Sequence, residues 1–244
     1  MTPVLNISAY RFVQLDKLPA LRTHLHDAAA ARGIKGTVLL AEEGINLFLA
    51  GAPEAVDDWL DVLQADARFA NFEVKRSHSD AQPFKRLKVK IKAEIIRMNH
   101  PAVRPAAGRA PAVDAQTLAR WITQGHDDVG RPLALLDTRN GFEVDEGAFE
   151  NAIDWRLSKF SDFPAAIERH RESLKDRTVV SYCTGGIRCE KAAIVMRELG
   201  LDHSYQLEGG ILKYFEDTGG AAPGWQGRCF VFDERVVLDT DLKP

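Results

Sequence analysis

Apolar residues follow two different rhythms along this chain. In the first 97 residues, runs with apolar side chains at alternate positions are typical of half-buried strands, and runs with apolar side chains three and four residues apart are typical of helices. These patterns predict strands at 4–13, 36–42, 45–49, 69–76 and 87–96. They also predict helices at 18–31 and from Pro53 onward, where a proline suits the first turn. We therefore expect a first domain that mixes strands and helices.

The order of these elements narrows the fold. Strand, helix, two strands, helix and strand is the ferredoxin-like α+β order, and it covers residues 1–97. Residues 98–112 include three prolines and little apolar periodicity, so we expect a linker. From 113 to 220 single strands alternate with helices, which predicts an open parallel α/β sheet with helices on both faces. In the C-terminal extension, 221–244, an alternating aromatic stretch is expected to add a strand to a sheet edge.

One stretch of the second domain combines a strand, a cysteine loop and a helix. Residues 178–182 read TVVSY, which is typical of a buried strand, and Cys183 follows directly. Gly185 and Gly186 allow a tight turn with positive φ. Apolar residues at helical spacing then run to Leu199, before Gly200 as a helix stop. The loop between strand and helix consists of Thr184, Gly185, Gly186, Ile187 and Arg188.

A cysteine in this position is expected to be reactive. The first amide groups of a helix are free to bind an anion, and Arg188 adds a permanent positive charge. Helix N-termini and nearby cations lower cysteine pKa values from about 8.5 to roughly 3.5–7.5. We therefore interpret Cys183 as a thiolate in an anion-binding loop rather than as an inert core cysteine.

The segment CTGGIRCEKA resembles the active-site loop of the rhodanese superfamily, and it looks most like that of the rhodanese-domain tRNA uridine 5-hydroxylases. The phrase LLDTRNGFEVDEGAFENAI resembles the first half of a rhodanese domain. The resemblance implies a rhodanese domain at 113–220 after a ferredoxin-like or acylphosphatase-like domain. It also implies hydroxylation of the wobble uridine of tRNA at C5, with Cys183 as the catalytic residue and molecular oxygen as co-substrate.

Composition and cysteine spacing restrict the other possibilities. Apolar residues at 45% and charged residues at 27% are typical of a globular protein. No apolar run approaches the roughly 20 residues that span a bilayer, and the N-terminus lacks a signal-peptide pattern, so we expect a cytoplasmic protein without membrane contact. The three cysteines and seven histidines do not have the spacing of a disulfide framework or a zinc site. We expect no bound metal and no tightly bound cofactor.

A basic strip in the first domain is the candidate site for tRNA. The formal net charge of −3 gives no general attraction to RNA, so binding requires a local patch. In 84–92 every second residue is expected to face a core, namely Leu87, Val89 and Ile91, with basic residues between them and Lys75 and Arg76 nearby. The alternative is an edge strand whose charges prevent aggregation. The basic strip consists of Lys85, Arg86, Lys88, Lys90 and Lys92.

Two of three further residues, Cys189 and Arg139, have two interpretations each. Cys189 is either a resolving thiol for Cys183 or a small packing group in the first turn of the helix. Arg139 either orients an anionic substrate or braces a turn through an internal ion pair with an acidic neighbour. Cys229 lies in an aromatic stretch and is expected to be structural.

Three functions fit these features. The leading one is a tRNA uridine hydroxylase, and the second is a rhodanese-type sulfurtransferase that carries a persulfide on Cys183. The third is an RNA-binding module in which the second domain is only a scaffold, although the intact Cys183 and Arg188 disfavour it. A sulfurtransferase needs no basic strip, so neutralising these lysines separates the first two functions. The sequence leaves the oligomeric state open.

Overall fold

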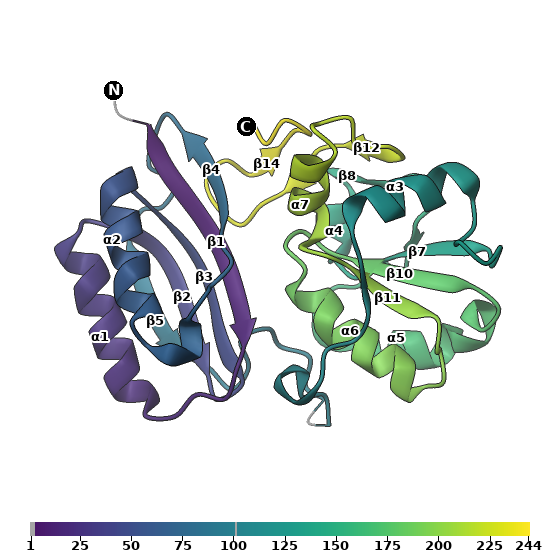
Figure 1. Cartoon of the computed structure of the whole chain (residues 1–244), viewed down its shortest axis with the longest axis horizontal. Coiled ribbons are helices and arrows are strands. Elements are labelled where there is room, and N and C mark those ends of the chain that lie inside the picture. The colour runs from purple at the N-terminus through teal and green to yellow at the C-terminus, as the bar shows by residue number, and fades with distance from the viewer. Residues whose placement is uncertain (1–2, 101) are drawn as a thin grey trace. The chain divides into compact units, whose positions relative to one another are not determined.

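The computed structural model describes residues 3–100 and 102–244, which form two compact units, Met1–Ile96 and Arg97–Pro244 (Figure 1). We refer to them as the N-terminal and C-terminal units, and each has a sheet of its own. Within the expected linker, Pro101 lies outside the described residues. Over the two described ranges, no helix is both long enough and apolar enough to cross a membrane.

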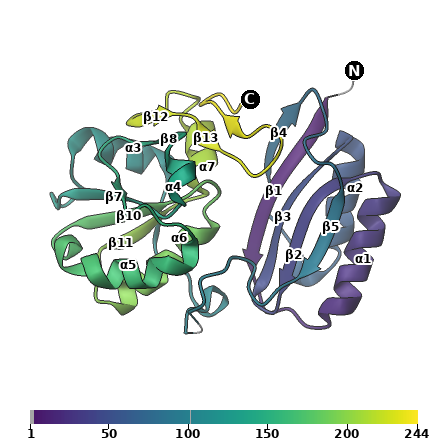
Figure 2. The ribbon, with the colours of Figure 1, turned by 180° about the vertical axis from the view of Figure 1, so that it is seen from behind.

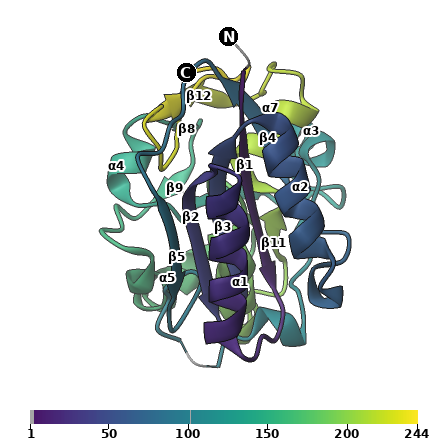
Figure 3. The same cartoon turned by 90° about the vertical axis from the view of Figure 1, so that its left-hand side faces the viewer.

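The N-terminal unit is built on a mixed five-stranded sheet in the order β4-β1-β3-β2-β5. Its first four strands are antiparallel, and β5 pairs in parallel with β2. Both helices lie side by side on one face of the sheet (Figure 3). The expected ferredoxin-like arrangement is therefore confirmed, with a fifth strand added at one edge. The elements are β1 (Val4–Phe12), α1 (Leu18–Ala31), β2 (Lys35–Ala41), β3 (Gly44–Gly51), α2 (Pro53–Gln64), β4 (Lys75–Ser79) and β5 (Leu87–Ile91).

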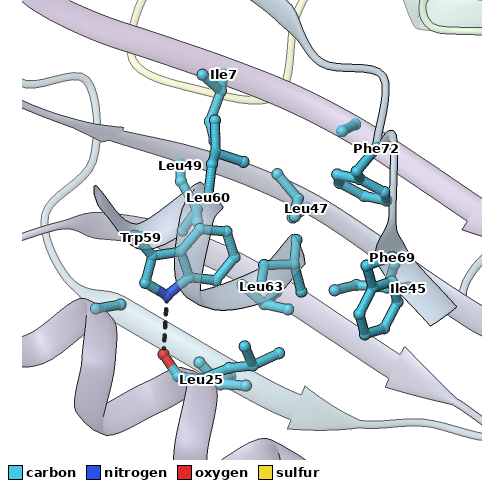
Figure 4. Packing of buried hydrophobic residues seen from close by; sticks show 14 of the residues in the cluster. Ile7, Leu25, Ile45, Leu47, Leu49, Trp59, Leu60, Leu63, Phe69 and Phe72 are labelled. Carbon is cyan, nitrogen blue, oxygen red and sulfur yellow. Dashed lines mark hydrogen bonds between the residues drawn. The ribbon is translucent and has the colours of Figure 1, made fainter. Parts of the chain in front are cut away.

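The core of this unit lies between the helices and the sheet (Figure 4). Alternate residues of β3, such as Leu47 and Leu49, meet the apolar face of α2, which carries Trp59 and Leu63. The Trp59 indole N–H donates to the carbonyl oxygen of Leu25 in α1 at 3.1 Å, so the largest buried side chain keeps its polar atom satisfied. Burial of these alternate positions fixes the register of the sheet.

Three predictions for the N-terminal unit are wrong in detail. The strand expected at 87–96 ends at Ile91. Residues 69–76 were expected to form one strand, but Phe69 ends a short 3-10 helix, Ala67–Phe69, and the strand begins at Lys75. Phe69 and Phe72 are buried in the core with their rings 5.9 Å apart, so packing rather than alternation places them. Ile91, expected to face the core, is 40% exposed because it ends an edge strand with a neighbour on one side only.

The C-terminal unit contains the expected parallel sheet. Its order is β6-β11-β10-β7-β9 and every pairing is parallel, which confirms a rhodanese-like open sheet. Helices α3 and α7 lie on one face, and α5 and α6 on the other, as Figures 1 and 2 show. The elements are β6 (Ala112–Val113), α3 (Ala115–Gln124), β7 (Leu133–Asp137), α4 (Gly141–Val144), β8 (Gly147–Phe149), β9 (Ile153–Asp154), α5 (Phe163–His170), β10 (Thr178–Tyr182), α6 (Ile187–Glu198), β11 (Ser204–Leu207) and α7 (Gly210–Asp217).

The C-terminal extension forms strands, but they pair outside the five-stranded sheet. Its first strand, β12 (Trp225–Gly227), pairs with β8, and β13 (Cys229–Phe230) pairs with β14 (Val237–Leu238). The Trp225 ring lies 5.2 Å from both Phe149 and Phe215. Packing of this ring against buried aromatics explains why the extension follows β8, near the cysteine loop, instead of a sheet edge.

Candidate active site

Cys183 lies where the central strand meets a helix. β10 ends at Tyr182, the loop follows, and α6 begins at Ile187. Gly186 is the N-cap of α6 with φ of 96°, a conformation that favours glycine. Gly185 was expected to share this positive φ but does not. The position of Cys183 at the carboxyl end of a parallel strand is the usual place for a ligand site in such sheets.

Donors converge on the sulfur atom of Cys183. The Gly186 amide donates to Sγ at 3.2 Å, and the backbone N–H groups of Arg188 and Cys189 in the first turn of α6 also favour the charged form of the sulfur. Burial alone would raise the pKa of the thiol, but the Cys189 thiol, the Arg188 charge and these amides outweigh burial and lower the pKa to about 5. The structure therefore favours a thiolate at neutral pH.

Cys189 donates its thiol proton toward Cys183 rather than competing for the negative charge. It is completely buried, and its sulfur lies 3.8 Å from the hydroxyl oxygen of Thr138. Burial raises the pKa of Cys189 well above its ordinary value, and the hydrogen bond and charge of Cys183 raise it further. The two thiols of the pair thus differ sharply in acidity. Sequence reasoning did not single out Thr138, since nothing in the pattern marks it.

Arg188 is not the free cation that the sequence suggested. Its guanidinium binds both carboxylate oxygens of Glu143, with Nη1–Oε1 at 2.6 Å and Nη2–Oε2 at 2.7 Å. Glu143 Oε1 also accepts the Asn140 amide at 3.0 Å, which closes the capping box at the start of α4. Both charged side chains are buried, so the pair is shielded from water. It is a fixed dipole beside the loop, with its positive end near Cys183.

Arg139 braces the neighbouring strand end. Its guanidinium is fully buried, pairs with Asp137 at 2.6 Å, and donates to the backbone oxygens of Glu143 and Gly147. It also lies over the ring of Trp225, 5.5 Å from the centroid. This arrangement matches the bracing interpretation, because these donors are directed at the end of β7 and at the backbone of α4 and β8. Arg139 thereby joins the end of β7 to the backbone of α4 and β8.

The N-terminus of α7 holds the cysteine loop from the other side. The amides of Ile211 and Leu212 donate to the carbonyl oxygens of Cys183 and Thr184, at 3.0 and 3.1 Å. Gly210 makes this approach possible, since a Cβ there would lie 2.4 Å from the Cys183 oxygen and 2.6 Å from the Gly186 nitrogen. Sequence reasoning did not single out this contact. The Gly209-Gly210 pair was the signal that a close backbone approach occurs there.

The C-terminal extension also contacts the loop. The Thr184 hydroxyl donates to the Phe230 carbonyl oxygen at 3.3 Å, which ties β13 to the residue after Cys183. Cys229, the residue before Phe230, is buried, and burial raises the pKa of its thiol to about 12. A thiol of this kind stays protonated at neutral pH, in line with a structural role.

The expected tRNA-binding residues lie on and before the edge strand β5. Lys88 and Lys90 pair with Thr37 and Leu39 of β2, and Val89 pairs with the buried Val38. The two lysines therefore lie on the sheet face that α1 and α2 do not cover. Lys85, Arg86 and Lys92 are exposed at the two ends of β5.

Lys75 and Arg76 do not adjoin the basic strip, contrary to expectation. They lie on β4, at the opposite edge of the sheet, with β1, β3 and β2 between. The sequence places these residues about ten positions from the strip, but the chain crosses the whole sheet in that interval.

Metal ligands do not gather in the described residues. Across 3–100 and 102–244, no group of three or more His, Cys, Asp or Glu side chains has an arrangement that holds a metal ion.

Comparison with known proteins places the chain in a family. Two family models match it, the UPF0176 acylphosphatase like domain at residues 4–95 and the Rhodanese-like domain at 114–217. The chain is 62% identical over 244 residues to a tRNA uridine(34) hydroxylase of Bordetella petrii, covering 100% of this chain and 96% of that protein. The chain belongs to the tRNA uridine(34) hydroxylase family. The family recognised from the cysteine loop is thereby confirmed.

Other members of the tRNA uridine(34) hydroxylase family match along almost the whole chain. The protein of that name from Variovorax paradoxus is 62% identical over 242 residues, which is 99% of this chain and 91% of the relative. The one from Cupriavidus taiwanensis is 56% identical over 241 residues, 99% of this chain and 85% of the relative. Both units of the fold are therefore common to the chain and its relatives in this family.

Proposed function

We propose that this protein hydroxylates uridine 34 of tRNA at C5, with Cys183 as the reacting group and molecular oxygen as co-substrate. The observation that carries the proposal is the position of Cys183 at the start of α6, where the Gly186 amide donates to its sulfur, in a chain that matches tRNA uridine(34) hydroxylases over its whole length. The name of these relatives supplies the substrate and the reaction class. The hydrogen bond to the Cys183 sulfur and the lowered pKa of this thiol support its assignment as the nucleophile.

The step proposed for Cys183 is covalent. Its thiolate adds to C6 of uracil, which moves the electron pair of the C5=C6 bond toward C5 and the C4 carbonyl oxygen. Molecular oxygen forms a bond to C5 with this electron pair, and the resulting peroxide anion takes up one proton to give a C5 hydroperoxide. Loss of the C5 proton then expels the thiolate and restores the double bond. A thiol reductant supplies the two electrons and two protons that convert the hydroperoxide to 5-hydroxyuridine and water.

The loop suits both halves of this cycle. The amides of Gly186, Arg188 and Cys189 stabilise the thiolate as nucleophile and again as leaving group. Cys189 keeps its own proton, so we assign it the role of a donor that positions Cys183 rather than that of a resolving thiol. The same donors would stabilise a persulfide anion, and this is why sulfur transfer remains the rival activity.

We assign tRNA binding to the basic strip. Lys88 and Lys90 share the sheet face that lacks helices, and Lys85, Arg86 and Lys92 extend the positive charge at both ends of β5. Contacts of this kind bind phosphates and set affinity, while the recognition of uridine 34 depends on other residues.

Mass spectrometry of nucleosides tests the proposed reaction. Purified protein is incubated aerobically with tRNA and a thiol reductant, and uridine should gain one oxygen atom. Cys183→Ser should abolish the gain, while Cys229→Ala, which removes a buried thiol outside the amide cradle, should retain it. If Cys183→Ser still hydroxylated uridine, covalent addition through Cys183 would be excluded. If wild type transferred sulfur from thiosulfate and added no oxygen, the protein would be a sulfurtransferase.

A further inference from the structure

Two half-exposed phenylalanines lie close to the cysteine loop, and packing within the fold does not require their exposed surface. Phe142 and Phe232 are each 50% exposed. Both rings pack edge-to-face against Phe230, with centroids 5.2 Å apart in each pair. We call Phe142, Phe230 and Phe232 the aromatic cluster. Phe230 packs against both of the other rings and is itself half-buried, so Phe142 and Phe232 are the more exposed rings of the cluster.

The aromatic cluster is tied to the loop at two points. Phe142 directly precedes Glu143, whose carboxylate holds Arg188. The Phe230 carbonyl oxygen accepts the Thr184 hydroxyl at 3.3 Å. The cluster therefore occupies a fixed position relative to the residues around Cys183, and each tie is a contact within the C-terminal unit.

The loop is open to a ligand at one residue. Cys183 has no exposed surface, and Thr184, Gly186 and Ile187 are also buried. Gly185 is only half-buried, and a Cβ at this position would meet no atom within 4 Å. A base that approaches Cys183 has open space beside Gly185, the residue that follows Thr184 and its bond to the aromatic cluster.

Base stacking explains what exposed rings at this place would bind. A uracil must leave the stack of its neighbours before a nucleophile can reach C6, and the stacking it loses must be replaced. Aromatic side chains replace it at single-stranded RNA sites, because every base has a π-face. Arg228, one residue before β13, is exposed and adds a positive charge for the RNA backbone.

We propose that Phe142 and Phe232 form a stacking platform for an unstacked base of the tRNA anticodon loop, either uridine 34 or its immediate neighbour. This inference rests on the proposed function, since it names the residues that receive the base at that same site. It gives the C-terminal extension a role in binding substrate, because the extension supplies Phe230 and Phe232. The two phenylalanines are binding residues rather than catalytic ones.

Substitution of the ring separates stacking from general hydrophobic contact. Phe142→Ala and Phe232→Ala should each weaken binding of an anticodon stem-loop RNA by about 5- to 150-fold, the range expected for loss of one base–aromatic stack. Phe232→Leu should bind as weakly as Phe232→Ala, and Phe232→Trp should restore binding. Val129→Ala is the matched control, because Val129 is 79% exposed in the turn before β7, away from the loop at the carboxyl ends of the strands.

Two further measurements make the outcome decisive. The titration of the Cys183 thiolate should be unchanged in the phenylalanine variants, which shows that the loop is intact. Photo-crosslinking with 5-bromouridine, placed at position 34 and at each neighbour in turn, should label Phe142 or Phe232. Full RNA affinity in both alanine variants, or in Phe232→Leu, would overturn the platform even if wild type hydroxylates tRNA. If wild type bound no RNA, the proposed function would fail together with it. Self-association that depends on Phe232 would identify the cluster as a contact between two copies of the chain.

Discussion

The carboxylate of Glu143 accepts two hydrogen bonds from the guanidinium of Arg188, 2.6 and 2.7 Å long. Neither side chain is more than 6% exposed. The pair connects α4 to the first turn of α6. Because charges removed from water are tolerated only when they are paired, the pair fixes where the cation of the loop lies. The electrostatics at Cys183 thus depend on a residue of another segment.

Glu143→Gln should be strongly destabilising. It leaves the Arg188 charge buried without its counter-ion, and loss of one partner of a buried pair costs about 3–5 kcal/mol. The free energy of unfolding, measured by urea denaturation, should fall by that amount. Asp145→Asn removes the solvent-exposed partner of Arg156 and should leave the unfolding midpoint almost unchanged. Equal effects of the two substitutions would mean that Glu143 and Arg188 are not shielded from water.

The lowered pKa of Cys183 predicts the pH dependence of activity. The thiolate predominates above pH about 5, so hydroxylation that depends on it should be constant through neutral pH and fall as the pH drops through about 5. The ultraviolet absorbance of the thiolate, taken as the difference between wild type and Cys183→Ser, follows the same titration. A midpoint near the pKa of a free thiol, about 8.5, would contradict the stabilisation of the Cys183 thiolate by the donors around it.

Cys189→Ala should raise the pKa of Cys183, because it removes a donor to the thiolate. The midpoint of the absorbance titration should move upward, and activity near pH 5 should fall more than activity near pH 8. Cys229→Ala serves as the comparison, since its thiol has a pKa of about 12 and does not titrate in this range. An unchanged midpoint in Cys189→Ala would reduce Cys189 to a packing group.

Gly210→Ala should inactivate the protein by moving the cysteine loop. The new Cβ would lie 2.4 Å from the Cys183 oxygen, a distance that real Cβ atoms do not show, so the backbone has to shift. Gly125→Ala is a close control, with φ of 78° against 71° for Gly210 and no atom within 4 Å of its Cβ. It should show only the cost of the left-handed conformation, roughly 1–2 kcal/mol, and keep its activity. Nucleoside mass spectrometry and thermal unfolding measure the two effects.

Neutralising the basic strip should weaken tRNA binding without changing sulfur chemistry. Lys88→Gln combined with Lys90→Gln should lower the affinity and reduce the slope of log K against log salt by about one unit for each phosphate that is no longer neutralised. Lys17→Gln, which changes an exposed lysine at the start of α1, should leave the slope unchanged. Were the double variant to keep the wild-type slope, β5 would be a charged edge that prevents aggregation.

Much of the fold was predictable because it depends on local pattern. Alternation and helical spacing predicted the elements of both units, and the run from Thr178 to Gly186 predicted the strand, the loop and the helix start in their observed order. The prediction of a strand at 69–76 was wrong because Phe69 and Phe72 are buried in the core without belonging to a strand. Alternation cannot separate these two reasons for an apolar residue.

The features of the site that the sequence did not predict depend on contacts between segments far apart in the chain. Glu143 neutralises Arg188 from 45 residues away, and Phe230 reaches Thr184 across a separation of 46. No spacing rule links such positions, so a single sequence showed Arg188 as a free cation and the extension as an ordinary edge strand. Lys75 and the basic strip show the converse, since residues near each other in sequence lie at opposite edges of a sheet.

The two amides at the start of α7 determine how much freedom the cysteine loop retains. By binding the carbonyl oxygens of Cys183 and Thr184, they orient both peptide planes before any substrate arrives. Ordering a backbone residue costs about 1–2 kcal/mol, and here that cost is met during folding instead of at each turnover. The loop is pre-organised, so a change that frays α7 should slow catalysis even though these amides bind backbone oxygens and not the sulfur.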